Sequence, residues 1–145
     1  MQLTPHFSLE ELTITQHRDI DNTVNDDSSK QNLLQLAYKL ETVRSILGYP
    51  LVISSGYRCL ELNRAIGSKD TSAHVKGLAA DFICPKYGIP ETVFEYLLTK
   101  KELKYDQLIL EKLRGKSWIH IGLKENPEKY RQQALIIDKF GTHTI

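Results

Sequence analysis

The ten residues from Ser72 to Asp81 hold the side chains best suited to metal chemistry. His74 lies in a polar stretch, Gly77 permits a sharp turn, and Asp81 follows in a predicted strand. The spacing of seven residues between imidazole and carboxylate is too long for one helical turn, but it suits a loop that folds back onto its strand. Both groups are zinc ligands, at about 2.0–2.2 Å. A surface loop histidine with a turn-capping aspartate is the alternative interpretation.

A histidine within an apolar segment offers a third ligand. His120 is flanked by Ile119 and Ile121. An imidazole without a partner is costly in apolar surroundings. A lone histidine in a strand is more often a hydrogen-bonded core residue than a metal ligand, and the residues alone leave both interpretations open.

Hydrophobic periodicity and capping signals indicate the elements that must position these side chains. We expect four helices. A short one begins with a Ser8–Glu11 capping box, with Phe7 packed against Leu12. The main amphipathic helix covers 33–47 and is ended by Gly48, a short helix ends at Gly67, and the last covers about 90–100. We expect strands at 51–55, 78–83, 107–110, 118–123 and 131–138. The polar stretch 15–30 predicts an irregular surface loop.

The order of these elements indicates the fold class. Helices and strands do not alternate regularly, which favours an α+β fold around a small, mainly antiparallel sheet flanked by helices. The segments 107–110 and 118–123 flank Gly115 and predict a hairpin. A length of 145 residues fits one domain, 1–145.

Composition excludes several classes of partner. The chain has 19 basic and 18 acidic side chains, so an extended nucleic-acid-binding face is not expected. No apolar run approaches the roughly 20 residues of a membrane span, and the first residues do not resemble a signal peptide. We therefore expect a monomeric protein without membrane or nucleic-acid partners, cytoplasmic as synthesised. Cys59 and Cys84 are expected to be reduced thiols.

Three segments resemble one peptidase family. The stretch Ser72 to Asp81 matches the pattern S-x-H-x-x-G-x-A-x-D of the zinc D-Ala-D-Ala carboxypeptidase family, peptidase family M15, which includes phage L-alanyl-D-glutamate endolysins and D-Ala-D-Ala dipeptidases. Ser54 to Asn63 resembles the family segment S-S-G-Y-R-x-x-x-L-N, and 118–120 resembles W-[VI]-H. The opening residues 6–12 resemble the start of shorter phage and bacterial members. The three motifs follow in family order, which makes the resemblance specific.

The resemblance implies a function and a fold. It assigns His74, Asp81 and His120 as ligands of one zinc ion with an open coordination position, as a catalytic site requires. It implies a hedgehog/DD-peptidase-like fold and hydrolysis of peptide bonds in peptidoglycan stem peptides or their precursors. The implied chemistry is attack of a zinc-activated water on a peptide carbonyl.

Two further roles come from the resemblance. Arg58 matches the family arginine that supports the substrate or the developing oxyanion, which suits a permanently charged fork of donors. The alternative for Arg58 is a surface ion pair. Ser72 matches a serine that binds substrate or a ligand, and its alternative is a turn or cap.

The sequence departs from the family at the general base. Members commonly have an acid three residues before the last histidine ligand, and Ser117 stands there. A hydroxyl cannot replace a carboxylate as a proton acceptor near neutral pH. Glu111 is the first substitute and Asp106 a weaker one, whereas His6, His17 and His143 are expected bystanders.

The register of the hairpin decides whether Glu111 can serve. If Leu108 pairs with His120, Glu111 points to the opposite face. If Glu111 opposes Trp118, it shares the face of His120. The sequence leaves this register open.

Two other functions therefore stay in view. One is a catalytically impaired zinc-containing domain that binds peptidoglycan or protein. The other is a phage structural module that engages peptidoglycan. An active enzyme would act on wall precursors in the cytoplasm, or reach the wall on release by phage lysis.

Overall fold

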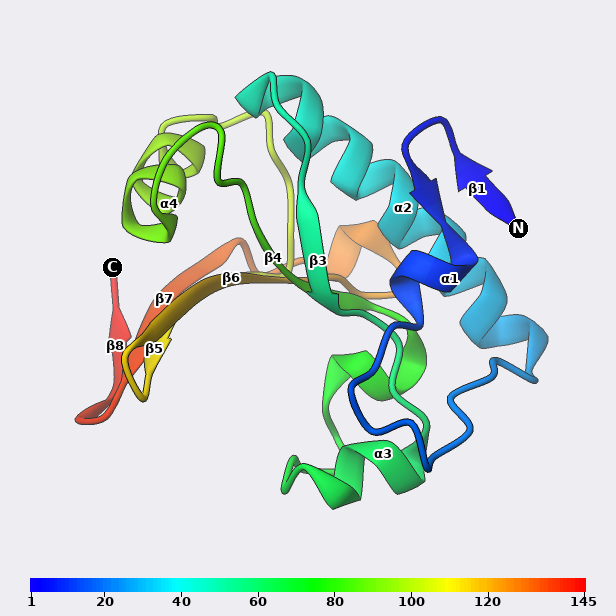
Figure 1. Ribbon diagram of the computed structural model, residues 1–145. Helices are drawn as coiled ribbons and strands as arrows, with labels where there is room; N and C mark the ends of the chain where they lie inside the picture. Colours follow the sequence, from blue (N-terminus) through cyan, green and yellow to red (C-terminus); the bar gives the residue numbers. More distant parts are fainter.

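A six-stranded mixed sheet with helices packed beside it forms the centre of the molecule, as the computed structural model of residues 1–145 shows (Figure 1). The strands lie in the order β3 (Val52–Ser55), β4 (Ala79–Ile83), β6 (Lys116–Gly122), β5 (Gln107–Leu113), β7 (Gln133–Asp138) and β8 (Gly141–Thr144). Only the β5–β7 pair is parallel. A separate antiparallel pair joins β1 (Gln2–Thr4) and β2 (Phe7–Ser8). The predicted α+β class is therefore confirmed.

The helices begin and end largely where capping chemistry predicts. They are α1 (Leu9–Leu12), α2 (Asp27–Leu47), α3 (Leu60–Ala65) and α4 (Pro90–Leu98), with single 3₁₀ turns at η1 (Ala73–Lys76) and η2 (Pro127–Lys129). The Ser8–Glu11 capping box is present, and Gly48 ends α2 in a left-handed conformation. None of these helices is long and apolar enough to cross a membrane.

The polar loop expected over 15–30 is partly wrong. Helix α2 begins at Asp27, where the Asp26 side chain accepts a hydrogen bond from the Ser29 backbone N–H at 2.8 Å. The first turn is polar because it is a capped end, so the apolar period starts only at Leu33. Strands β1, β2 and β8 were not predicted, since two to four residues carry too little pattern to recognise.

The central strands divide their side chains between two faces. On one face, Ala80, Phe82, Leu108, Ile119 and Ile121 join the main hydrophobic core with the buried side of α2. Because side chains alternate along a strand, the intervening residues face the other way. The second face carries the polar side chains singled out in the sequence.

The turn between β5 and β6 settles the hairpin register. Arg114 and Gly115 both have positive φ, at 54° and 75°, as a two-residue type I′ turn requires. This turn pairs Glu111 with Trp118 and Ile109 with His120. Glu111 and His120 therefore share one face of the sheet, and the register with Leu108 opposite His120 is wrong.

Candidate metal centre

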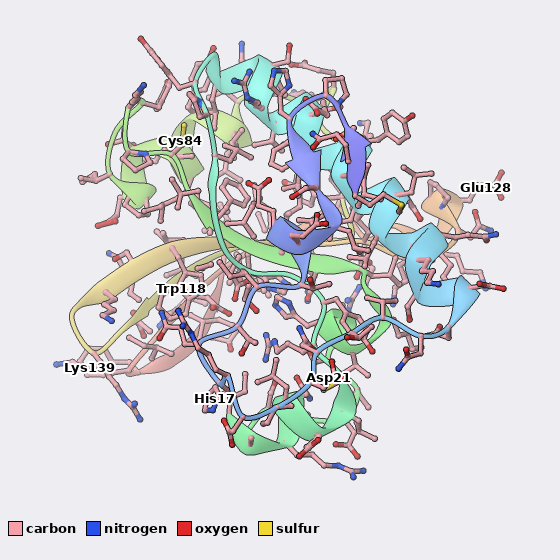
Figure 2. All side chains as sticks on the ribbon, turned by 45° about the vertical axis from the view of Figure 1, so that its right-hand side comes forward. His17, Asp21, Cys84, Trp118, Glu128 and Lys139 are labelled. Carbon is pink, nitrogen blue, oxygen red and sulfur yellow. The ribbon has the colours of Figure 1, made fainter.

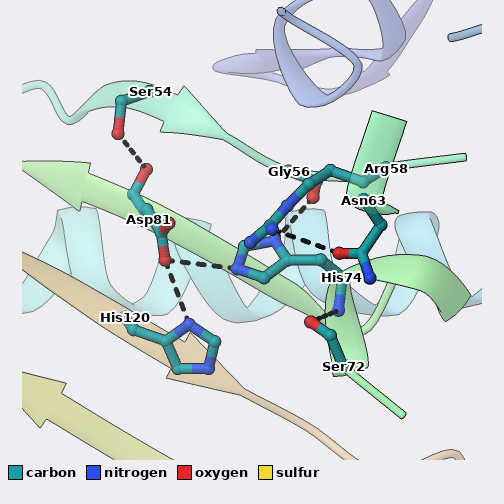
Figure 3. Close-up of polar contacts among 8 residues, drawn as sticks. All are labelled: Ser54, Gly56, Arg58, Asn63, Ser72, His74, Asp81 and His120. Atoms are coloured by element: carbon teal, nitrogen blue, oxygen red, sulfur yellow. Dashed lines mark hydrogen bonds and ion pairs between the residues drawn. The ribbon is translucent and has the colours of Figure 1, made fainter. Parts of the chain in front are cut away.

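Three candidate ligands converge on one point of the second sheet face. The Asp81 Oδ1 atom lies 3.3 Å from His74 Nε2 and 3.0 Å from His120 Nδ1 (Figure 3). One ligand atom from each residue lies within 4.8 Å of the other two. Two imidazoles and one carboxylate from separate segments are a donor set that zinc accepts. The group can therefore hold a metal ion.

The hydrogen bonds of His74 test whether a cation fits. Its Nδ1 atom lies 2.7 Å from the Gly56 carbonyl oxygen, so Nδ1 carries the proton and donates it. The lone pair of Nε2 then faces the Asp81 carboxylate, and Nε2 is buried without a hydrogen-bond partner. A lone pair against a carboxylate oxygen is unfavourable unless a cation lies between them. In metal-binding histidines, the ring nitrogen that does not bind the metal commonly donates to a backbone carbonyl, as Nδ1 of His74 does here.

Local backbone geometry places His74. It lies in η1, which Ser72 caps and Gly77 ends with φ at 73°. The acceptor Gly56 is itself pressed against α1, because a Cβ there would overlap the Leu12 carbonyl. That carbonyl accepts a hydrogen bond from the Tyr57 N–H at 2.7 Å. Gly56 is therefore required so that its segment can approach the Leu12 carbonyl of α1 closely.

Strand pairing places the other two ligands. Asp81 in β4 lies directly opposite His120 in β6. Gly122 makes room for the ring, since a Cβ on it would be 3.2 Å from His120 Nε2. The sequence left open whether His120 is a hydrogen-bonded core residue or a metal ligand. The ring is hydrogen-bonded, but its partner is the Asp81 carboxylate, which is itself a candidate ligand.

Burial and neighbouring charges shift the ionisation of all three ligands. Burial raises the pKa of the Asp81 carboxyl, but the two facing imidazoles outweigh it and hold this pKa well below its usual range. Burial lowers the pKa of His74, which favours the neutral imidazole that a metal needs. Burial also lowers the pKa of His120, but the hydrogen bond and charge of Asp81 raise it above its ordinary value.

Arg58 is a buried cation beside this group. Its side chain is only 8% exposed and forms no ion pair, so it is not a surface salt bridge. Its backbone N–H donates to the His74 carbonyl at 3.0 Å, and Nη1 donates to Asn63 Oδ1 at 3.1 Å. Burial lowers the pKa of the guanidinium, while the charges of Asp81 and Glu111 oppose this. The Nε atom is buried without a partner.

Two buried asparagines hold the Arg58 segment, and the sequence assigned them no role. Asn63 is fully buried and also donates to the Lys69 carbonyl at 2.8 Å. Asn22 donates to the Tyr57 carbonyl at 2.8 Å and accepts from the Cys59 N–H at 2.7 Å. Asn63 lies in a family segment and could have been found there. Asn22 lies in a polar stretch without any signal.

Ser72 acts as a cap in this structure. Its Oγ accepts a hydrogen bond from the His74 backbone N–H at 3.3 Å. It also lines an open groove that reaches His120. The cap alternative of the sequence is therefore observed, and any substrate contact of Ser72 stays a prediction.

Glu111 approaches the centre from β5. Its side chain is partly buried on the face of His120 and lies opposite Trp118, whose indole N–H is buried without a hydrogen-bond partner. Burial raises the pKa of the Glu111 carboxyl, and the charge of Asp81 raises it further, whereas the charge of His120, the nearby Trp118 indole and the charge of Arg58 lower it. This carboxyl therefore belongs to the same electrostatic group as the ligands.

The serine at the usual acidic position has a structural explanation. Ser117 and His120 are three residues apart in a regular strand, so their side chains point to opposite faces. An acid at position 117 would not face the ligands in this strand. On the neighbouring strand β5, Glu111 does share the face of His120.

The weaker candidate base is engaged elsewhere. Asp106 is buried and receives two hydrogen bonds from the Arg131 guanidinium, at 3.0 and 2.8 Å. The expected bystanders also lie apart from the ligand group. His6 pairs with Glu41, His143 pairs with Asp138, and His17 is exposed. Both cysteines are free thiols; Cys59 caps α3 and Cys84 is buried.

Comparison with known proteins agrees with this geometry. A family model described as Peptidase M15 matches residues 5–122. The match includes all three candidate ligands, Arg58 and Glu111. A search of curated proteins found no match.

Proposed function

Because the chain belongs to the peptidase M15 family, a family of zinc-dependent peptidases, we propose that it hydrolyses peptide bonds in peptidoglycan stem peptides. The D-Ala-D-Ala carboxypeptidase or endolysin type and a hedgehog/DD-peptidase-like fold are parts of this proposal. One observation supports it above the others. The His74, Asp81 and His120 ligand atoms converge on the sheet face that also carries a partly buried carboxyl, Glu111.

The donor set suits a catalytic ion. Three protein ligands leave a coordination position open, whereas a structural zinc takes four. Zinc bound here would supply Lewis-acid polarisation of the scissile carbonyl and a water that ionises near neutral pH. The Gly56 carbonyl keeps the His74 ring oriented for binding.

Glu111 is the proposed general base and acid. Its raised pKa means that the carboxyl exchanges a proton more readily near neutral pH than an exposed glutamate does. It would accept the proton of the attacking water and deliver it to the nitrogen of the leaving amine. Both transfers require only that one carboxyl remain beside the cleaved bond.

Arg58 is the proposed oxyanion donor. Its charge is buried, so its field on a developing negative charge is poorly screened. Asn63 holds Nη1 and thereby fixes the plane of the guanidinium. The Nε N–H is buried without a hydrogen-bond partner in the chain.

The competing function is a zinc-containing domain that binds peptidoglycan or protein without cutting it, such as a phage structural module. Ser117 at the usual acidic position favours it. Turnover separates the two, whereas metal content does not.

The test is incubation of the zinc-loaded protein with peptidoglycan and with soluble stem peptides, followed by mass spectrometry of the products. We expect a defined peptide bond to be cut, loss of cutting with a chelator, and recovery on adding zinc. The Glu111→Gln variant, which retains all three ligands, is the matched inactive control. Binding of the peptides without any new product would favour the competing function.

A further inference from the structure

An open groove of about 920 Å³ adjoins the metal centre. Ile109, His120 and Gly122 line it from the sheet face of the ligands. Ser72 and Lys76 line it from η1, and the connection after β6 lines another part. A volume of this size accommodates a short peptide segment.

The groove is far more basic than the molecule as a whole. The chain has 19 basic and 18 acidic residues. The cations lining the groove are Lys69, Lys76, Lys124, Lys129 and Arg131, and its anions are Asp106 and Glu125. Five positive charges against two give the groove a positive charge that the near-neutral composition does not show. The distribution of charge, rather than its sum, marks this surface.

Pairing within the groove leaves the excess positive charge free. Asp106 is held by both arms of the Arg131 guanidinium and lies 3.9 Å from Lys124 Nζ. Its charge is therefore neutralised. Lys69, Lys76 and Lys129 form no ion pair. These three lysines line the groove, and Glu125 is the one other anion of the groove that could balance them.

We propose that this groove binds the carboxylate-bearing part of a peptide substrate, so that the enzyme selects anionic peptides. The inference rests on the proposed peptidase function, since His120 belongs to both the groove and the metal centre. Carboxylates of the peptide take the place of the missing counter-charges. Each exposed contact contributes modestly, and several together give selectivity.

The lysines of the groove lie outside the strand pair that carries Glu111 and His120. Lys76 belongs to η1 and Lys129 to η2, whereas Glu111 lies on β5 and His120 on β6. We therefore expect the lysines to act in binding rather than in proton transfer. Their loss is expected to raise KM and Kd with little change in kcat.

The test compares a synthetic stem peptide with the same peptide amidated at its carboxyls. Kd is measured by calorimetry on the protein with and without zinc, which requires no turnover. We expect the acidic peptide to bind about tenfold tighter at low salt, and the preference to shrink at high salt. The double variant Lys76→Gln, Lys129→Gln is expected to lose most of the preference.

The control is Lys139→Gln. Figure 2 shows Lys139 and Glu128, the neighbour of groove residue Lys129, at opposite edges of the molecule. This variant should keep the full preference. Equal Kd for the two peptides, or a preference unchanged in the double variant, would overturn the proposal. Equally tight binding of a short oligonucleotide would also overturn it, because the groove would then be a general polyanion site.

The same data separate this proposal from the proposed function. A protein that prefers the acidic peptide but cuts nothing would contradict the peptidase function and keep the groove. A protein that cuts acidic and amidated peptides with equal KM would keep the peptidase function and contradict the groove.

Discussion

The metal ligands and Glu111 reach the same sheet face from regions of different construction. His74 is 2% exposed and held by a backbone carbonyl, and the Asp81–His120 pair joins two central strands. Glu111 lies near the end of a hairpin whose turn, at Arg114 and Gly115, is exposed. The ligand region is fixed by close packing. The hairpin region is fixed by register.

This difference suggests how the catalytic base can differ while the ligands stay in place. A ligand requires specific neighbours on several segments, as Gly56 and Gly122 show. A base requires only a carboxyl on the correct strand face. A glutamate on β5 meets that condition where position 117 on β6 does not. The two regions should therefore respond differently to substitution.

Replacing Glu111 should have the largest effect and should be confined to chemistry. We expect Glu111→Gln to lower kcat by about 10²–10⁴, because general acid–base assistance is removed. Zinc content and the melting temperature should not change. The exposed Glu102→Gln serves as control in the same kinetic assay. Normal turnover by Glu111→Gln would contradict the assignment of the base to the hairpin.

Arg58 tests whether the ligand region also contributes to catalysis. Arg58→Ala should lower kcat/KM by about 10²–10³, as expected for loss of one oxyanion donor. Arg58→Lys should recover little, because an ammonium lacks the planar fork. Arg64→Ala, which removes an exposed ion pair with Asp70, is the control. Steady-state kinetics and thermal melts on all three variants separate the roles, and equal losses of stability and activity in Arg58→Ala would indicate a structural residue.

Gly56→Ala should damage the ligand region through packing. The new methyl group overlaps the Leu12 carbonyl, and such overpacking costs about 1–3 kcal/mol. The shifted backbone also moves the acceptor of His74 Nδ1, so zinc affinity should fall together with stability. Urea unfolding and zinc titration measure both. Gly115→Ala is the comparison in the hairpin, and it should keep zinc affinity even where it loses stability.

The contribution of the Asp106 carboxylate to the stability of the fold should depend on pH. The hydrogen bonds from Arg131 lower the pKa of Asp106. A depressed folded-state pKa stabilises the fold above the unfolded-state pKa, about 3.9, and this contribution is lost as pH falls through the folded-state pKa. We expect Asp106→Asn to cost about 1 kcal/mol at pH 7, since Arg131 is half exposed. Urea unfolding should show this gap closing in acid, and a gap that is constant with pH would contradict the ion-pair explanation.

The sequence alone predicted the residues whose roles depend on contacts with near neighbours in the chain. The capping box at Ser8, the stop at Gly48 and the pairing of His74 with Asp81 follow from short-range patterns that leave clear signals. The register of the hairpin could not be read, because one residue more or less in the turn reverses every face. Asn22 was missed for another reason. Its role depends on contact with residues 35 positions away, which no local pattern reports.

The central claim is that His74, Asp81 and His120 hold one zinc ion, and metal analysis of purified variants tests it most directly. Wild type and the surface variant His143→Ala, whose ring pairs only with Asp138, should each contain close to one zinc per chain. His120→Ala should contain almost none while remaining folded by circular dichroism. Undiminished zinc in folded His120→Ala would contradict the assignment of this metal centre.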